Sequence, residues 1–128
     1  MLTVTIPRAD WRVKLDEFSS VLEGWRVSLD VLTPELGAQP EISDLPLRGV
    51  SAEVGARDST ITIAAGWKDS EQITHTIHAP IRVRLEQNEA GADVALEIES
   101  SDHAKAIVRV MSPALPETVD GVRRGGAR

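Results

Sequence analysis

The stretch IRVRLEQNEAGADVALEIES, residues 81–100, holds two runs of alternating apolar and polar residues around a short polar segment. Such alternation is typical of half-buried β-strands. With residues 89–92 as the loop, the two runs pair as a β-hairpin in which Val83 lies opposite Ile98 and Leu85 opposite Leu96. The apolar residues of each run then share one face: Ile81, Val83 and Leu85 in the first, and Val94, Leu96 and Ile98 in the second.

The polar face of this hairpin supports the same register. Arg84 lies opposite Glu97 and Arg82 opposite Glu99, so opposite charges face each other. A slip of one residue would move the apolar residues to the solvent face. We therefore interpret Glu97 and Glu99 as members of an exposed ion-pair ladder, in preference to a pair of catalytic carboxylates.

The following turn, SDHA, predicts a second hairpin that leads into AIVRV. A three-residue loop at Asp102 to Ala104 sets Val108 opposite Ile98. A two-residue loop is the alternative. Sequential hairpins of this kind favour antiparallel order over parallel order.

A helix precedes the strands. Pro7 suits a first helical turn, and Gly24 follows the last periodic residue as a C-terminal cap. The apolar residues recur at steps of four, three and four, which predicts an amphipathic helix from Pro7 to about Leu22: Trp11, Leu15, Phe18 and Leu22.

After the helix the apolar period changes to two. Alternation predicts strands at 25–31, 47–53, 60–65 and 73–78 in addition to the hairpins, while TPELGAQPE and WKDSEQ are typical of connections. The expected fold is α+β: an N-terminal amphipathic helix packed on a curved antiparallel sheet or small barrel of about seven strands. We expect a single domain over 1–116 and a flexible C-terminal tail over 117–128.

Composition limits the function. The chain has 128 residues, 41% hydrophobic and 27% charged, with no cysteine and a net charge of −6. Acidic chains repel phosphate backbones, and the absence of tyrosine removes most platforms for base stacking, so we expect no nucleic-acid partner. No window approaches the roughly 18 apolar residues of a membrane span. We expect no membrane association and a cytoplasmic location.

ITHTIHAP, residues 73–80, contains His75 and His78 at a spacing that raises the question of a metal site. The β-branched content and the terminal Pro80 favour a strand, in which residues three apart point to opposite faces. His75 would share a face with Ile73 and Ile77, and His78 would point away. We therefore expect no metal and no cofactor, and keep His75 as a weak candidate for contact with a ligand or partner.

Trp67 begins the polar connection WKDSEQ. An exposed aromatic residue in such a place is typical of a contact with a ligand or partner. The alternative is that Trp67 folds back as a lid over the end of the sheet.

Several segments together, namely IPRADW, FSSVLEGWRVSLDVL, GAQPE, LPLRGVS, HTIHAPIRVRLEQ and LEIESSD, resemble a bacterial family known as domain of unknown function 5335. The resemblance runs from about Thr5 to Val110. It implies a single domain and no particular activity, cofactor or catalytic residue. Where such sequences tend to have Asp-Gly in the last hairpin, this chain has Asp102-His103.

No group of residues in the sequence forms a recognisable catalytic or cofactor motif. We therefore expect a non-enzymatic protein-interaction or accessory module, which binds a protein partner or forms a homodimer through a sheet face or edge. The alternative is a small-ligand-binding protein or small enzyme with a pocket between helix and sheet, and with Trp67 and His75 at its mouth. A filled core with an apolar outer patch would favour the first, and a large internal cavity the second.

Overall fold

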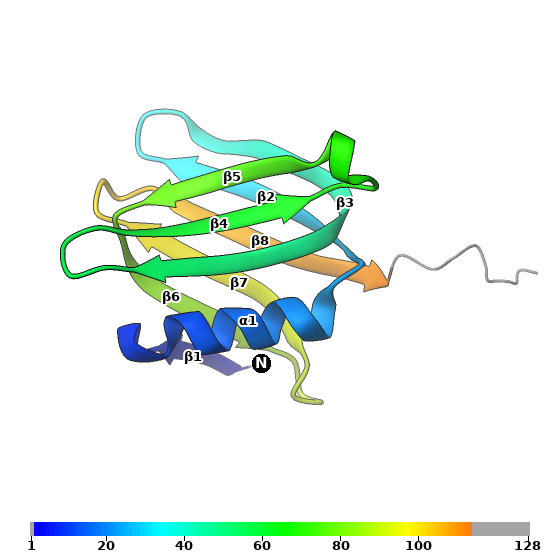
Figure 1. Cartoon of the computed structure of the whole chain (residues 1–128), viewed down its shortest axis with the longest axis horizontal. Helices are drawn as coiled ribbons and strands as arrows, with labels where there is room; N and C mark the ends of the chain where they lie inside the picture. The colour runs from blue at the N-terminus through cyan, green and yellow to red at the C-terminus, as the bar shows by residue number, and fades with distance from the viewer. Residues whose placement is uncertain (1, 114–128) are drawn as a thin grey trace, which may run out of the picture.

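The computed structural model describes residues 2–113, which form one sheet of eight antiparallel strands and one α-helix (Figure 1). The strand order is β1-β6-β7-β8-β2-β3-β4-β5. The elements in chain order are β1 (Leu2–Ile6), the 3-10 turn η1 (Arg8–Asp10), α1 (Trp11–Leu22), β2 (Trp25–Thr33), β3 (Gly37–Val54), β4 (Ser59–Ala65), the 3-10 turn η2 (Asp69–Glu71), β5 (Ile73–His78), β6 (Pro80–Gln87), β7 (Asp93–Ser100) and β8 (Lys105–Pro113).

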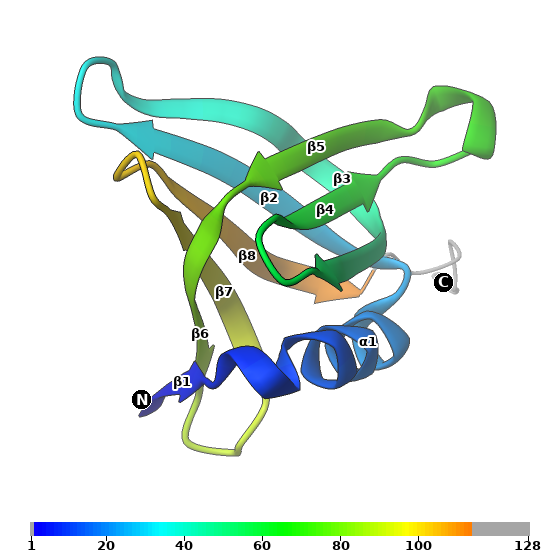
Figure 2. The same ribbon diagram turned by 60° about the vertical axis from the view of Figure 1, so that its left-hand side comes forward.

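The sheet bends at two corners and does not close into a barrel (Figure 2). At the first corner, β3 pairs with β2 through its first half and with β4 from Leu47 onward. Register shifts in both ladders and a φ of 58° at Asp44 mark this bend. At the second corner the chain passes from β5 to β6 through Ala79, whose φ is 51°. β1 and β5 are the two edges.

The helix lies across the opening between the β3–β4 side and the β6–β1 side of the folded sheet (Figures 1 and 2). Its closest neighbour is β3, to which Ser19 ties it: the Ser19 hydroxyl accepts a hydrogen bond from the amide of Val50 at 2.7 Å. Ser19 Oγ also lies 2.8 Å from the carbonyl oxygens of Leu15 and Val50. A helix ending at Leu22 is confirmed, but it begins at Trp11 and not at Pro7, because residues 8–10 form a 3-10 turn. The predicted packing of the helix on the sheet is wrong in detail, since the helix spans an opening along β3.

The interior of the fold is filled by one hydrophobic cluster. The helix stripe contributes Trp11, Leu15, Phe18 and Leu22, each at most 4% exposed. The indole N–H of Trp11 donates to the carbonyl of Ile6 at 3.0 Å, which satisfies its one polar atom. The sheet contributes mainly aliphatic residues, including Val27, Leu29, Ile42, Leu47, Val50, Ile61, Ile63, Val83, Leu96, Ile98 and Val108.

The predicted strand count of about seven is wrong. β1 was not expected, although LTVTI alternates aliphatic residues with threonine, and it pairs with β6 from Leu2 opposite Gln87 to Ile6 opposite Val83. The segment predicted as the connection TPELGAQPE is also largely strand, because β3 begins at Gly37. Pro40 is tolerated there because this half of β3 pairs with β2 alone and passes Pro40 at a register shift.

The register predicted for β6 and β7 is confirmed: Val83 pairs with Ile98, Leu85 with Leu96, Arg84 with Glu97 and Arg82 with Glu99. The predicted position of Ile81 on the buried face is wrong, since Ile81 is 51% exposed. A register shift between Pro80 and Arg82 places Pro80 inward in its stead.

The register predicted for β7 and β8 is wrong by two residues. Ile98 pairs with Ala106, not with Val108, which pairs with Leu96. The loop has the predicted length of three residues but begins one residue earlier, at Ser101, because the amide of Ser100 donates to the carbonyl of Ala104 at 2.9 Å and the amide of His103 to the carbonyl of Ser100 at 3.0 Å. A shift of two residues keeps every side chain on its predicted face. The predicted tail, residues 117–128, lies outside the described residues.

In the part of the chain that the structure describes, no helix has the length and apolar character needed to cross a membrane.

Candidate interaction edge

The free edge of β5 is the feature of this fold with the clearest capacity to bind. β5 pairs with β4 on one side, in an unbroken register from Thr60 opposite His78 to Ala65 opposite Ile73, and is the last strand of the sheet on the other. Its sequence, ITHTIH, contains no proline, no Asp or Glu, and no Lys or Arg. Bulges, prolines and charges are the usual devices that block pairing at an exposed edge, and β5 has none of them.

The backbone of β5 presents hydrogen-bonding groups at this edge. Antiparallel strands alternate between pairs that exchange two hydrogen bonds and pairs that exchange none. Ala79 donates to the carbonyl of Ser59 at 3.2 Å, and continuing the alternation makes Thr60–His78 and Thr62–Thr76 pairs of the second kind. The N–H and C=O groups of Thr74, Thr76 and His78 therefore point away from β4, toward the free edge.

The two histidines lie on opposite faces of β5, as predicted. His75 is half-buried, next to buried Ile77, whereas His78 is exposed. Residues 75–78 form one wall of a cleft of about 270 Å³, whose other walls come from β2 and the β7–β8 hairpin. No group of three or more His, Cys, Asp or Glu side chains placed to hold a metal occurs within residues 2–113.

The cleft is lined by both apolar and polar residues. Val31, Ile77, Ile98 and Ala106 contribute apolar surface, and Ser100 and Lys105 are among the polar residues that line it. A side chain that enters this cleft would therefore meet both aliphatic and hydrogen-bonding groups.

The loop at the tip of the β7–β8 hairpin is held by Asp102. Its carboxylate accepts a hydrogen bond from the Ser100 hydroxyl at 2.5 Å and another from the amide of Ala104 at 3.0 Å. These bonds, that from Ser100 first, hold the pKa of Asp102 below its ordinary value. His103 follows with a φ of 72°, a left-handed conformation in which glycine is the favoured residue.

Trp67 stands at the other end of β5. It follows β4 directly and is 57% exposed, so it does not form the buried lid that was the alternative interpretation. Ile73, which pairs with Ala65 at the end of β4, is 42% exposed. Gly66, directly before Trp67, leaves no space for a side chain, because an added Cβ would lie 2.9 Å from the Cα of Gln72. Trp67 therefore projects from a tight turn beside an exposed aliphatic residue.

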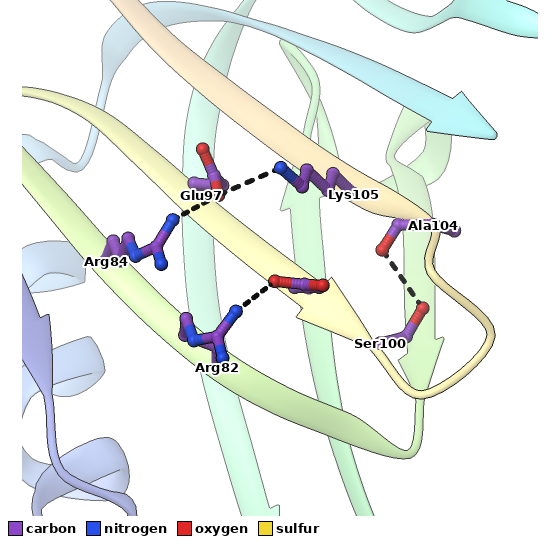
Figure 3. A network of polar contacts seen from close by, with 7 residues as sticks. Arg82, Arg84, Glu97, Ser100, Ala104 and Lys105 are labelled. Carbon is purple, nitrogen blue, oxygen red and sulfur yellow. Dashed lines mark hydrogen bonds and ion pairs between the residues drawn. The ribbon is translucent and has the colours of Figure 1, made fainter. Parts of the chain in front are cut away.

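The outer face of the other half of the sheet is different, because its charges are paired (Figure 3). Arg82 meets Glu99 at 2.6 Å, and Glu97 meets Arg84 at 3.3 Å and Lys105 at 4.0 Å. The predicted ion-pair ladder is present, and Glu97 lies between two cations. Strong opposite-charge pairing of this kind leaves Glu97 and Glu99 as structural partners of basic residues.

A second concavity lies near the other end of the sheet. It has a volume of about 550 Å³ and includes Val21, Trp25, Val110 and Met111, beside the β6–β7 loop. Val21 and Met111 are 70% and 56% exposed. This concavity therefore includes exposed apolar surface of the kind that often marks interaction sites.

The model of a family of unknown function (DUF5335) matches residues 2–118. The chain belongs to this family. No curated protein and no solved structure matches it.

Of the residues predicted from sequence, His75 lines the cleft of this DUF5335 member, and Trp67 lies outside that cleft at the far end of β5. The predicted common mouth for the two residues is therefore not formed. Sequence reasoning missed the edge itself, and with it Thr74, Thr76 and Ile73. No local signal marks β5 as an edge, since the interior strand β4 is equally free of charged residues.

Proposed function

We propose that this DUF5335 member is a non-enzymatic protein-interaction module that binds an extended protein segment along the free edge of β5. The observation that carries the proposal is the edge: a regular strand with unpaired backbone groups and no blocking residue. Main-chain hydrogen bonds would supply affinity, and the adjacent cleft would receive a side chain of the added segment.

The other exposed strand edges of the fold differ from the β5 edge, and the differences support the choice of β5. The first half of β3 has an unpaired side as well, but it carries Pro40, Glu41 and Asp44 and passes through two register shifts. Such residues block strand addition. β1 is the other edge of the sheet, and the cleft beside His75 distinguishes β5 from it.

The filled interior supports an interaction module over a carrier with an internal pocket. Side chains of α1 occupy the space between helix and sheet, since Leu15 is 0% and Phe18 1% exposed. A pocket enclosed beneath the helix would need this cluster to be absent. The concavity of about 440 Å³ that α1 does form with β3 and β4 lies at the surface, lined in part by exposed Asp16, Glu23 and Gln72. The location in the cytoplasm and the lack of a nucleic-acid partner remain predictions from composition.

A second function, the binding of a small ligand, has one observation in its favour: the cleft combines apolar residues with His75, Ser100 and Lys105. Its volume of about 270 Å³ lies at the lower end of the range of roughly 300–1,000 Å³ that is usual for small-molecule sites. The cleft fits a single side chain better than a whole ligand. We therefore rank this function second.

The experiment is a selection of extended peptides. A library of random nonapeptides displayed on phage is selected on wild-type protein, and the enriched peptides are measured by isothermal titration against two variants. Thr76→Pro removes an outward-facing N–H without removing a bond to β4, and should weaken binding at least about tenfold, a loss of roughly 1.4 kcal/mol. Val4→Lys, on the other edge, is the matched control and should leave affinity unchanged.

Peptides that bind Thr76→Pro as tightly as wild type would place the binding surface elsewhere and overturn the proposal. If no peptide is enriched, a parallel thermal-shift screen tests small molecules. A small molecule that raises the unfolding temperature of wild type but not of His75→Ala would favour the second function.

A further inference from the structure

The sequence of β5 reads the same in both directions about His75: Ile73-Thr74-His75-Thr76-Ile77. An antiparallel pairing of two such strands centred on His75 would place each residue opposite its own kind. Ile73 would face Ile77 of the second strand, and Thr74 would face Thr76. A symmetric contact between two identical surfaces has this self-complementary form.

We infer that the occupant of the β5 edge is a second copy of this chain, paired antiparallel through β5 about a two-fold axis at His75. The inference rests on the proposed function and names its partner. The two copies would then share a continuous sheet across the axis.

The phase of the backbone allows this register. Thr74 and Thr76 direct their N–H and C=O groups toward the free edge, and the two-fold sets Thr74 opposite Thr76 of the second copy. Outward-facing groups thus meet outward-facing groups, as a hydrogen-bonded antiparallel pair requires. A register displaced by one residue would set an outward-facing residue opposite one that is already bonded to β4.

Side-chain chemistry also fits. Aliphatic and threonine pairs on opposing strands are favourable cross-strand neighbours. Ile73 is 42% exposed in the single copy and would be covered by the buried Ile77 of the other. Trp67, 57% exposed beyond the Ile73 end, would lie near the second copy's His78 end and extend the contact beyond the strand.

No Asp, Glu, Lys or Arg of β5 opposes self-association at this edge, and the same holds for the other edge strand, β1. Each copy carries a net charge of −6, which opposes association in general, but β5 itself has no Asp, Glu, Lys or Arg. The electrostatic repulsion between the two copies therefore acts at long range, and physiological salt screens it beyond about 8 Å. Added salt should therefore strengthen the dimer, whereas it would weaken a dimer that is held together by ion pairs.

The absence of cysteine allows a direct test of the register. In the proposed dimer His75 opposes itself in a non-hydrogen-bonded pair, in which Cα atoms lie about 4.5 Å apart, within reach of a disulfide. Under mild oxidation His75→Cys should form a cross-linked dimer at least about tenfold faster than His78→Cys or Val4→Cys. A mixture of Thr74→Cys and Thr76→Cys should cross-link as a heterodimer, while each alone should not.

Sedimentation equilibrium completes the test. Wild type should dimerise, more tightly at 0.5 M than at 0.05 M NaCl. His75→Lys, which sets two positive charges face to face, should raise the dimer dissociation constant at least about tenfold. The conservative His75→Gln should retain the dimer.

The outcomes separate the two proposals. A wild-type monomer at 1 mM whose peptide binding is still lost in Thr76→Pro overturns the second copy and leaves the β5 edge as a site for another protein. A dimer that cross-links through Val4→Cys in preference to His75→Cys overturns the inference as well. A monomer that selects no peptide overturns both.

Discussion

The guanidinium of Arg26 donates two hydrogen bonds to the carboxylate of Asp44 at the bend of β3, one from Nε to Oδ1 at 2.8 Å and one from Nη2 to Oδ2. Asp44 has a φ of 58°, in the left-handed region that costs most residues about 1 kcal/mol or more. The pair therefore holds a strained residue at the corner where β3 passes from one half of the sheet to the other.

Replacement of Asp44 by alanine should lower the free energy of unfolding by about 1 to 2 kcal/mol, because the left-handed conformation stays while a partly exposed ion pair is lost. Asp44→Gly should cost less than Asp44→Ala, since glycine adopts the conformation without strain. Urea unfolding measures both. Equal losses in the two variants would show that backbone strain at this corner is unimportant.

Ser19→Ala should lower stability by roughly 1 to 2 kcal/mol, because the amide of Val50 loses its partner at a partly buried position. The neighbouring Ser20 is exposed, so Ser20→Ala is the matched control and should change stability by less than about 0.5 kcal/mol. Chemical denaturation of both variants decides the point. Two equal, small changes would mean that water replaces the hydroxyl and that Ser19 does not anchor the helix.

The tryptophans should divide by burial. Trp11 is 2% exposed and Trp67 57% exposed. Trp11→Ala should cost about 3 to 5 kcal/mol through the cavity it leaves, and Trp67→Ala less than about 0.5 kcal/mol. Thermal unfolding followed by circular dichroism compares the two. A large loss in Trp67→Ala would indicate that the tryptophan is covered in solution, and its dependence on protein concentration would then separate an interface from a fold-back onto the sheet.

Glu97→Lys should destabilise the protein by about 1 kcal/mol at low salt, because three positive side chains would then meet on adjacent strands. In 1 M NaCl, where the screening length is about 3 Å, most of this loss should disappear. Glu97→Gln, which removes attraction without adding repulsion, is the control and should lose less. A loss of several kcal/mol at every salt concentration would instead place this face inside an interface.

Asp102 gives a prediction for pH. Its pKa in the folded protein is below the ordinary value of 3.8, chiefly because of the Ser100 hydroxyl, so its ionised form stabilises the fold above about that pH. This contribution should vanish as the pH falls through the lowered pKa. Wild type should therefore unfold at a higher temperature than Asp102→Asn at pH 7, with a difference that shrinks toward pH 2. A difference independent of pH would exclude this carboxylate as the cause.

Elements with strong periodicity could be predicted from sequence. The helix stripe beginning at Trp11 and the β6–β7 register were correct because burial on one face and ion pairs on the other specify them together. β1 was missed because five residues give too little periodicity, and Ile81 was misplaced because a bulge is decided by the neighbouring strand. The β7–β8 register depended on hydrogen bonds at Ser100, which alternation alone cannot reveal.

The candidate site was harder to predict than the fold. His75 was selected for its imidazole, but its place beside the cleft follows from Ala79, which turns the chain between the two halves of the sheet. Whether a strand is an edge depends on which segments pair across the whole chain. β5 reads locally like any other strand, and its exposure appears once the order of all eight strands is known.

The position of β8 has a consequence for folding during synthesis on the ribosome. This strand, the last one described, lies between β7 and β2 in the interior of the sheet order, so the pairing of Arg26 with Ser112 spans most of the chain. A ribosome releases segments in order, and until Lys105–Pro113 emerges both β2 and β7 lack a neighbour. Completion of the sheet must therefore follow synthesis through residue 113, and the many distant contacts favour slow folding. During that interval the nascent protein presents several more open edges than the mature one, and it is then that assistance from chaperones would matter most.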